Sequence, residues 1–485
     1  MTDALAPPGP LSDTSQRSRE HRSWYFYDWA NSAFVTTTAT VLFGPYLTAV
    51  AESAACGEAG TPQSPCHGDL SVLGLPIAAG SVAPYAVTFA TLLSAVLLPL
   101  VGAIADRTSR KRHMLAGFAW IGAAAAACMF FVTGANWALG VGLLVIATIC
   151  LGSSLVVYDA VLVQIAHEDE RDRVSSRGWA LGYLGGGLLL AVNLAIVTLE
   201  PFGLSRGESV RVCLLSAGLW WGVWTIIPFR GLRDRPVTGA VEVTADGETP
   251  GMMRQAFGQL ATTVRHARGY PQTLLFLGAY LLYNDGIQTV IYAASIFGNR
   301  ELGLSEDVLI VAILMVQFLA FAGALLLGRL AERFGNISIV LASLVVWVLV
   351  VVAAGYFLPV GAVVPFFALA VAIGLVLGGS QALSRSIYSL LIPKGKEAEY
   401  FSLYQAAERG TSWFGTLAFG VAFQLTDSYR SAILVLIAFF VAGFALLAKV
   451  DMRRGIMTAG NELPARLRPE PPAPAEPGRR GGSRR

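Results

Sequence analysis

The chain carries the stretch Gly102-Ala-Ile-Ala-Asp106-Arg107-Thr-Ser-Arg110-Lys111-Arg112 at the end of an apolar span, and a weaker copy, Gly328-Arg-Leu-Ala-Glu332-Arg333, follows 226 residues later. The same offset relates Leu151-Gly152-Ser-Ser154 to Leu377-Gly378-Gly-Ser380. Two separated matches at one offset indicate a duplicated unit, with one copy in each half of the chain. Asp28 and Asp285 differ by 257, and the excess of 31 matches a long first outer loop that only the first half has.

The composition places this duplicated unit in a membrane. Of the 485 residues, 54% are apolar or aromatic and only 14% are charged, whereas soluble domains carry roughly 25% charged residues. These values exclude an ordinary soluble enzyme and a disordered chain. One crossing takes about 20 apolar residues, and the sequence has twelve such spans: 24–50, 81–105, 114–133, 137–166, 178–199, 210–229, 271–297, 307–328, 338–358, 362–392, 401–426 and 430–450. We therefore expect an all-α integral membrane fold with twelve transmembrane helices in two six-helix pseudo-repeats.

Lysine and arginine predict the orientation, because cytoplasmic loops carry an excess of both. The segments on the side of the two termini hold 29 of the 35 Lys and Arg, and the segments on the other side hold 4. We expect a multi-pass protein of the cell (plasma) membrane with both termini cytoplasmic. The spans divide the chain into a cytoplasmic tail 1–23, a six-helix bundle 24–229, a cytoplasmic linker 230–270, a second bundle 271–450 and a tail 451–485. The Pro, Gly and Arg content of the last tail predicts disorder.

Two cysteines, Cys56 and Cys66, share the first outer loop. If that loop faces an oxidising compartment, a disulfide is expected; the alternative is a pair of free thiols. In either case these residues would perform no chemistry. The sequence has no Walker, G-x-S-x-G or HExxH motif, and no cofactor or metal ion is expected.

The architecture resembles the major facilitator superfamily, and four motifs resemble one branch of it. They are Tyr27-Asp28-Trp29-Ala30-Asn31-Ser32, Tyr158-Asp159-Ala160 with Ser175-Ser176-Arg177-Gly178-Trp179 after it, Asn284-Asp285-Gly286, and Gly378-Gly379-Ser380-Gln381-Ala382-Leu383-Ser384-Arg385-Ser386. Together they are similar to the vacuole-effluxer-like family, also called the unknown major facilitator family, here of the bacterial type. The resemblance implies a secondary transporter that works by rocker-switch alternating access. The fungal members are linked to release of amino acids from the vacuole, so it also suggests amino acids.

The repeated stretch resembles the superfamily's loop signature and implies a gating role in both copies. Gly102 permits close helix approach, and Asp106 can face the positive N-terminus of a helix. The gating residues of the first copy also include three basic ones, Arg107, Arg110 and Lys111. In the second copy they are Gly328, Glu332 and Arg333. The alternative interpretation is a generic basic loop held at the inner surface.

Polar residues within spans are the candidates for binding, because they are costly in a bilayer. Helical spacing places Asp28, Asn31, Val35 and Thr38 on one stripe of the first span. It also aligns Asp285 with Gln288 and Tyr292, and Gln381 with Arg385 and Tyr388. The substrate- or proton-binding candidates are Asp28, Asn31, Asp159, Asp285, Gln288, Gln381 and Arg385. Trp24 and Trp179, near span ends, are expected to be interface anchors.

The carboxylate of Asp159 and the guanidinium of Arg385 lie at pseudo-equivalent positions, 226 residues apart. We expect them to form a gating ion pair across the cavity; alternatively, both sit in water at the inner helix ends. Arg385 would bind a substrate carboxylate. Asp285, deep in its span, would receive an ammonium group or a coupling proton, or make only a structural hydrogen bond. Asp28 has the same two roles open to it, or serves as an interfacial cap.

The leading hypothesis is secondary active transport of a small polar solute, with amino acids suggested and proton coupling expected. The partners are then a small-molecule substrate, a coupling proton and the lipid bilayer, with no nucleic acid and a monomeric state. The alternatives are efflux of amphipathic drugs or metabolites and a non-transporting membrane receptor or scaffold. The receptor would tolerate Asp285→Asn and Arg385→Ala, whereas a transporter would lose turnover.

Overall fold

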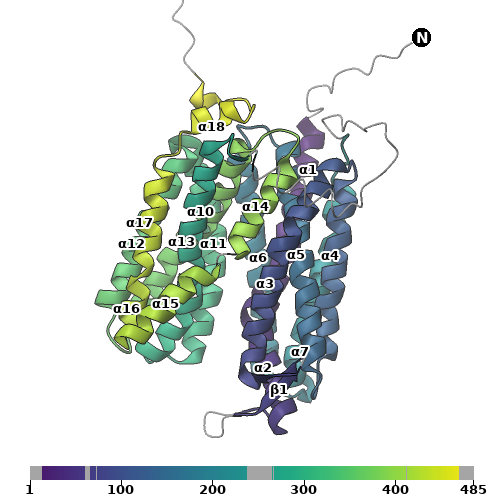
Figure 1. Ribbon diagram of the computed structural model, residues 1–485, viewed down its shortest axis with the longest axis vertical. Coiled ribbons are helices and arrows are strands. Elements are labelled where there is room, and N and C mark those ends of the chain that lie inside the picture. Colours follow the sequence, from purple (N-terminus) through teal and green to yellow (C-terminus); the bar gives the residue numbers. More distant parts are fainter. Residues whose placement is uncertain are drawn as a thin grey trace, which may run out of the picture.

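The computed structural model describes residues 14–60, 66–72, 74–236, 265, 267–410 and 412–468, and it is almost entirely helical (Figure 1). The first half contains α1 (Thr14–Ala33), the π-helix η1 (Phe34–Leu42), α2 (Phe43–Cys56), β1 (Asp69–Val72), β2 (Leu75–Ala78), η2 (Ala79–Ser81), α3 (Val82–Arg107), α4 (Lys111–Cys128), η3 (Met129–Phe131), α5 (Trp137–Ile165), α6 (Arg171–Leu199), η4 (Pro201–Gly203), α7 (Arg206–Trp224) and α8 (Ile226–Gly231).

The second half contains α10 (Pro271–Ile296), the π-helix η5 (Phe297–Glu301), α11 (Glu306–Phe334), α12 (Asn336–Phe357), α13 (Val363–Leu391), α14 (Glu397–Gly410), α15 (Ser412–Thr426), α16 (Tyr429–Leu434), α17 (Leu436–Leu447), α18 (Met452–Thr458) and η6 (Ala465–Leu467). Among the described residues, eleven helical stretches are long and apolar enough to cross a membrane. The remaining expected span, 401–426, corresponds to the two consecutive helices α14 and α15. The expected helical membrane fold is therefore confirmed.

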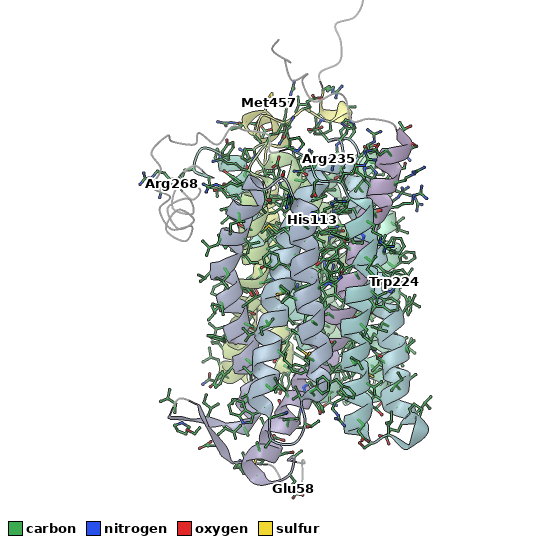
Figure 2. The ribbon with its side chains drawn as sticks, turned by 90° about the vertical axis from the view of Figure 1, so that its right-hand side faces the viewer. Glu58, His113, Trp224, Arg235, Arg268 and Met457 are labelled. Carbon is green, nitrogen blue, oxygen red and sulfur yellow. A yellow bond between two sulfur atoms is a disulfide. The ribbon has the colours of Figure 1, made fainter. Side chains whose placement is uncertain are left out.

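The helices form two bundles that stand side by side (Figure 1). We call α1–α8 the N bundle and α10–α17 the C bundle. The start of α1 and the helix α18 lie at one end of the molecule, which we call the terminal end, and the β1–β2 hairpin lies at the opposite, hairpin end. Figure 2 shows the same arrangement from the side, with Met457 and Arg235 at the terminal end and Glu58 at the hairpin end.

Small residues let the helices within a bundle approach closely, as is usual for membrane helices. In α6, a Cβ added to Gly185 would lie 2.8 Å from the Trp29 ring, and one added to Gly186 would lie 2.9 Å from Thr36. These glycines hold α6 against α1 and η1. This packing brings α1, which carries the stretch Tyr27–Ser32, into direct contact with α6, which carries Ser175–Trp179.

The main contacts between the bundles join α3 to α14, α6 to α11 and α13, and α5 to α13 and α14. The hydrogen bonds across this boundary gather toward the terminal end. For example, Arg171 Nη1 donates to Ser389 O at 2.8 Å, and Ser175 Oγ donates to Ala382 O at 2.6 Å. The two bundles are therefore joined most firmly where α5 and α13 end.

The segments outside the spans agree with the expectations only in part. The first outer loop contains a two-stranded antiparallel hairpin, β1–β2, so the fold is not purely α. Cys56 and Cys66 form the expected disulfide beside it, with Cα atoms 6.1 Å apart. Most of the expected linker 230–270 lies outside the described residues.

The expectation of disorder over the whole tail 451–485 is wrong for its first part. Residues 452–458 form α18, whose N-terminus is capped by the side chain of Asp451. Asn461 Nδ2 then donates to Leu390 O and Ile392 O at the end of α13, at 2.9 and 2.8 Å. These bonds to otherwise open helix-end carbonyls fix the segment, and composition alone does not reveal them. At the other end of the chain, α1 already begins at Thr14, within the expected tail 1–23.

Candidate functional site

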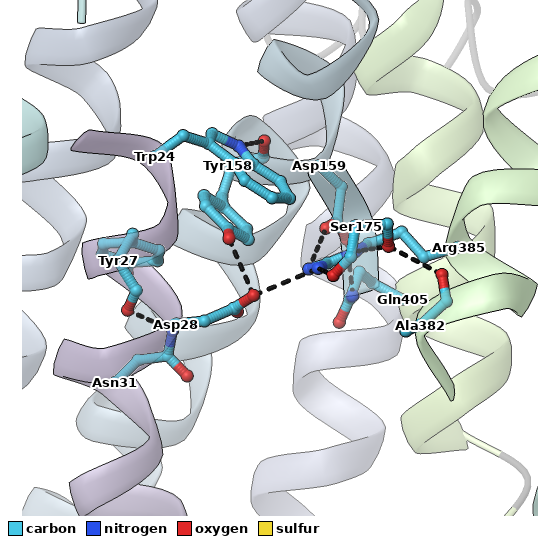
Figure 3. A network of polar contacts seen from close by, with 10 residues as sticks. All are labelled: Trp24, Tyr27, Asp28, Asn31, Tyr158, Asp159, Ser175, Ala382, Arg385 and Gln405. Atoms are coloured by element: carbon cyan, nitrogen blue, oxygen red, sulfur yellow. Dashed lines mark hydrogen bonds and ion pairs between the residues drawn. The ribbon is translucent and has the colours of Figure 1, made fainter. Parts of the chain in front are cut away.

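A buried arginine of the C bundle lies among acidic and polar groups of the N bundle (Figure 3). Arg385, on α13, is 2% exposed. Its Nη2 lies 3.1 Å from Asp28 Oδ2, and its Nη1 lies 3.4 Å from Asp159 Oδ1. Its Nε donates to Ser175 Oγ at 3.0 Å, and Nη2 also donates to Ser175 O at 3.1 Å. The expected contact between Asp159 and Arg385 is confirmed, and Asp28 joins it from α1.

Further hydrogen bonds hold the two carboxylates in place. Tyr158 Oη donates to Asp28 Oδ2 at 2.8 Å, and Gln405 Nε2 donates to Asp159 Oδ2 at 2.9 Å. Asp28 is 7% exposed and Asp159 is 1% exposed, so neither sits in water at a helix end, nor is Asp28 an interfacial cap. Burial of charge is tolerated only when the charges are paired and hydrogen-bonded. The cluster meets that condition through residues of both bundles.

Three aromatic rings surround the Arg385 guanidinium. Its Cζ lies 4.8 Å from the Trp24 ring centre, 5.3 Å from that of Tyr158 and 5.4 Å from that of Trp179. Trp24 stacks on Tyr158 with ring centres 4.2 Å apart, and its Nε1 donates to Tyr158 O. These distances are within the range of cation–π attraction. Trp24 has no exposed surface, so its expected role as an interface anchor is wrong.

Two glycines that follow Ser175 on α6 make room for this cluster. A Cβ added to Gly178 would lie 2.7 Å from Asp28 Oδ2 and 3.1 Å from Arg385 Nη2. One added to Gly182 would lie 2.8 Å from Ser32 Oγ. Glycine at position 178 is therefore what allows α6 to lie directly against the Asp28–Arg385 ion pair.

The first copy of the loop signature joins α3 to α14 at the terminal end. Asp106 accepts hydrogen bonds from the backbone N–H groups of Ala398 and Glu399, at 2.9 and 2.8 Å. These groups belong to the first turn of α14, so Asp106 faces a positive helix N-terminus as expected. Lys111 Nζ lies 3.2 Å from Asp106 Oδ1, while Arg107 and Arg110 are exposed at the surface. A Cβ added to Gly102 would lie 2.5 Å from Ala398 O.

The second copy keeps only part of this arrangement. Gly328 packs on α6, where an added Cβ would lie 2.5 Å from Ser176 Oγ. Glu332 and Arg333 are exposed, so the buried environment of Asp106 is not repeated in the second copy. Asn336 contacts α6 instead, because its Nδ2 donates to Asp172 Oδ1 at 3.1 Å.

The other binding candidates lie apart from the Arg385 cluster, in hydrogen bonds of their own bundle. Asp285 Oδ2 accepts the backbone N–H of Gly415, near the start of α15, at 2.7 Å, and Asp285 Oδ1 is buried without a partner. Gln381 Nε2 donates to Asn284 Oδ1 at 2.8 Å. Asn31 Nδ2 donates to Tyr27 O at 2.7 Å on the same helix. Gln288 is half-buried one turn beyond Asp285.

The expected stripes of polar residues hold only in part. Tyr292 is 59% exposed and Val35 is 36% exposed, whereas Thr38 is fully buried. The first stripe assumed α-helical spacing, but the chain is a π-helix from Phe34 to Leu42. The wider π turn shifts every later residue around the helix axis.

Sequence reasoning missed several members of the cluster. Ser175 and Gln405 contact charged atoms of the Asp28–Arg385–Asp159 group, yet neither is charged and neither was singled out. Ser175 belongs to a motif quoted for the family resemblance, which was a usable signal. Gln405 has no such signal, because its position depends on how α14 packs against α5. Among the residues that the structure describes, no group of three or more His, Cys, Asp or Glu could hold a metal ion.

Comparison with protein families and curated proteins identifies close relatives of the chain. A family model described as "Vacuole effluxer Atg22 like" matches residues 16–460. The MFS-type transporter YxiO of Bacillus subtilis is 30% identical over 455 residues, which cover 92% of this chain and 99% of that protein. Autophagy-related protein 22-2 of Aspergillus niger is 25% identical over 562 residues, which cover 93% of each chain.

Solved structures share the fold at low identity. The proton:xylose symporter XylE, a major facilitator protein, matches with a TM-score of 0.65 and 14% identity, covering 90% of this chain and 96% of that one. FucP, a major facilitator transporter in the outward conformation, matches with a TM-score of 0.61 and 12% identity, covering 90% and 98%. The described helices therefore have the architecture of that superfamily.

Proposed function

The chain belongs to the vacuole effluxer Atg22-like family of major facilitator transporters, and from that premise we propose that it moves a small polar solute by alternating access, with the Arg385 cluster as its gate. The family is one of secondary transporters rather than enzymes. The solute we propose is an amino acid, since the resemblance of the four sequence motifs suggests that class. Coupling to protons is part of the same proposal.

One observation carries the proposal: the charges of the cluster are divided between the bundles. Asp28 and Asp159 belong to the N bundle, and Arg385 belongs to the C bundle. In this superfamily one half rocks against the other around a site near the midplane. Separation of the terminal ends must break both ion pairs, and losing one partner of a buried pair costs about 3–5 kcal/mol. Something other than Arg385 must then compensate the two carboxylates.

The orientation follows from the charges of the loops. We take the terminal end as cytoplasmic, since 29 of the 35 Lys and Arg fall on that side and positive residues are retained in the cytoplasm. The location we propose is the plasma membrane, with both termini in the cytoplasm. The hydrogen bonds between the bundles at the terminal end then correspond to a closed cytoplasmic side.

Asp285 is the proposed proton site. Its Oδ2 is held by the Gly415 amide, and its buried Oδ1 has no partner, so a proton on Oδ1 would not displace an existing hydrogen bond. Gln288 and Gln381 lie on the neighbouring turns of the C bundle and would supply neutral hydrogen bonds to the solute. In the closed arrangement the Nε, Nη1 and Nη2 groups of Arg385 all donate to residues of the N bundle. Its expected binding of a substrate carboxylate therefore belongs to another conformation.

Counterflow in proteoliposomes tests the proposal. Liposomes are loaded with one unlabelled amino acid at a time, and entry of the labelled form is measured at pH 6 and pH 8. We expect exchange of at least one amino acid by the wild type and exchange at the level of empty liposomes for Arg385→Ala. Arg453→Ala, an exposed arginine on α18, is the matched control and should exchange like the wild type. Equal exchange by Arg385→Ala and the wild type would refute the gate.

A further inference from the structure

The surroundings of Arg385 form a cation-binding cage that belongs almost entirely to the other bundle. The carboxylates of Asp28 and Asp159, the Ser175 oxygens and the rings of Trp24, Tyr158 and Trp179 all contact the guanidinium, and all lie within residues 24–179. Only the cation itself comes from α13 of the C bundle. Figure 3 shows the Arg385 side chain extending from its helix toward Asp28, Asp159 and Ser175.

The cage holds its shape through bonds inside the N bundle. The Tyr158 hydroxyl donates to Asp28, and the Tyr158 backbone oxygen accepts from the Trp24 indole N–H. The Trp24 and Tyr158 rings are also stacked. None of these contacts involves the C bundle. The ring faces and the Asp28 carboxylate therefore remain in place when α13 moves away, whereas Asp159 loses both Arg385 and Gln405.

We propose that this cage, made of Trp24, Asp28, Tyr158, Asp159, Ser175 and Trp179, binds a guanidinium or alkylammonium group of the transported solute when Arg385 withdraws. This inference rests on the proposed alternating access. It assigns the transported solute to the class of organic cations and zwitterions, and it makes Arg385 a built-in competitor for the solute's site.

The chemistry of the cage favours an organic cation over a metal ion. Ring faces attract weakly hydrated cations such as guanidinium and alkylammonium, and the attraction is strongest after desolvation. Carboxylates on two sides and the Ser175 oxygens match the several N–H donors that such a group carries. The absence of a side chain at Gly178 leaves room for the cation beside Asp28, because a Cβ there would lie 3.1 Å from Arg385 Nη2. A small divalent cation is strongly hydrated and would make no comparable use of the three ring faces.

Chemical rescue tests the cage after its own cation has been removed. Arg385→Ala removes the guanidinium and leaves a space of its size, and the purified variant is titrated with ethylguanidinium, ethylammonium or the neutral ethylurea. We expect ethylguanidinium to raise the melting temperature of Arg385→Ala saturably and about tenfold more potently than ethylurea. The wild type, whose cage is filled, should not respond. Asp28→Asn/Arg385→Ala is the control and should lose the preference for the cation over ethylurea.

A second pair of variants tests the cage in the open state and leaves all six cage residues unchanged. Gly102→Trp places a large side chain against Ala398 and Ser402, and Gly328→Trp places one against Ser176, so each should keep the terminal ends apart. We expect these otherwise wild-type cages to bind ethylguanidinium or labelled arginine. The Asp28→Asn/Asp159→Asn change in either background should weaken binding by about tenfold or more.

The outcomes separate this inference from the proposed function. If neither Arg385→Ala nor the two tryptophan variants prefer the cation to ethylurea, the inference is overturned, and counterflow by the wild type would still support transport. A wild type that exchanges only anionic or uncharged solutes would also overturn it. Cation binding by the cage in a protein that exchanges no solute would instead support the cage and refute the transporter.

Discussion

The N bundle and the C bundle carry an aspartate at corresponding places in their first helices, and the two side chains have different partners. Asp28, on α1, pairs with Arg385 of the opposite bundle at 3.1 Å. Asp285, on α10, accepts a hydrogen bond from Gly415 of its own bundle at 2.7 Å. Both are nearly fully buried. One contact exists only while the bundles are together at the terminal end, and the other does not depend on how they are arranged.

We propose that duplication supplied the two positions and that later divergence separated their tasks. A carboxylate paired across the boundary stabilises the closed arrangement. A carboxylate held by its own bundle is available to a proton or solute in every arrangement. The two copies of the loop signature diverge in the same way, because Asp106 caps α14 across the boundary while Glu332 is exposed.

Arg385→Ala should have the largest effect. It leaves Asp28 and Asp159 buried without their cation, which costs about 3–5 kcal/mol, and the closed arrangement should become the minor one. We expect solute exchange to fall to the level of empty liposomes and the melting temperature to drop. Arg385→Lys keeps the charge but not the forked geometry, so it should retain a measurable part of the exchange. Full activity of Arg385→Ala would contradict the account.

Asp28→Asn and Asp285→Asn should separate gating from coupling. Asp28→Asn removes one of two ion pairs, so exchange should slow both at equilibrium and under a gradient. Asp285→Asn should spare exchange at equal pH on both sides but abolish accumulation driven by a pH gradient. The check is counterflow and gradient-driven uptake measured on the same liposomes. Identical behaviour of the two variants would remove the distinction drawn between the bundles.

Asp106→Ala and Glu332→Ala compare the two copies of the loop signature directly. Asp106→Ala removes a helix-capping acceptor, which typically costs about 1 kcal/mol. Glu332→Ala alters an exposed position and should lie within about 0.5 kcal/mol of the wild type. Thermal unfolding and exchange rates check both. An equal loss in the two variants would mean that the second copy also works as a cap in some other conformation.

Arg466→Ala should have the smallest effect of the series. Arg466 lies 3.3 Å from Asp172 of the N bundle and donates to Ala331 O of the C bundle at 2.8 Å, so it joins the bundles at the terminal end. Partly exposed ion pairs contribute about 0–1 kcal/mol. We expect a modest rise in the fraction of molecules whose terminal end is open, and little change in melting temperature. A shift as large as that of Asp28→Asn would make this tail segment a principal part of the gate.

Much of the fold follows from hydropathy, because each crossing needs a long apolar helix and each loop needs polar residues. The helices lie close to the expected spans, with α5 at Trp137–Ile165 against the expected 137–166. The hairpin β1–β2 and the ordered tail segment escaped prediction for another reason. The hairpin depends on backbone pairing between two short adjacent strands, for example Leu70 with Ile77. The tail segment depends on side-chain bonds to a distant helix end, such as that from Asn461 Nδ2 to Leu390 O, and composition reveals neither.

The site was predictable where a charge and an offset coincided. The 226-residue offset pointed to Asp159 and Arg385, and the contact between them is confirmed. The sequence could not predict that Asp28 and Asp285 have different partners, because those partners are set by packing between helices rather than by position along them. The predicted polar stripe from Asp28 to Thr38 was wrong because the π-helix η1 changes the helical period. No residue type in that stretch predicts a π turn.

The most direct test measures the distance between the bundles at the terminal end. Spin labels at two exposed positions, Arg173 on α6 and Arg333 on α11, report whether this end is open or closed, in a background where Cys128, Cys150 and Cys213 are replaced by serine. The account predicts a single short distance in the wild type and in Asp285→Asn, and an added longer distance in Asp28→Asn and Arg385→Ala. The same short distance in all four proteins would contradict it.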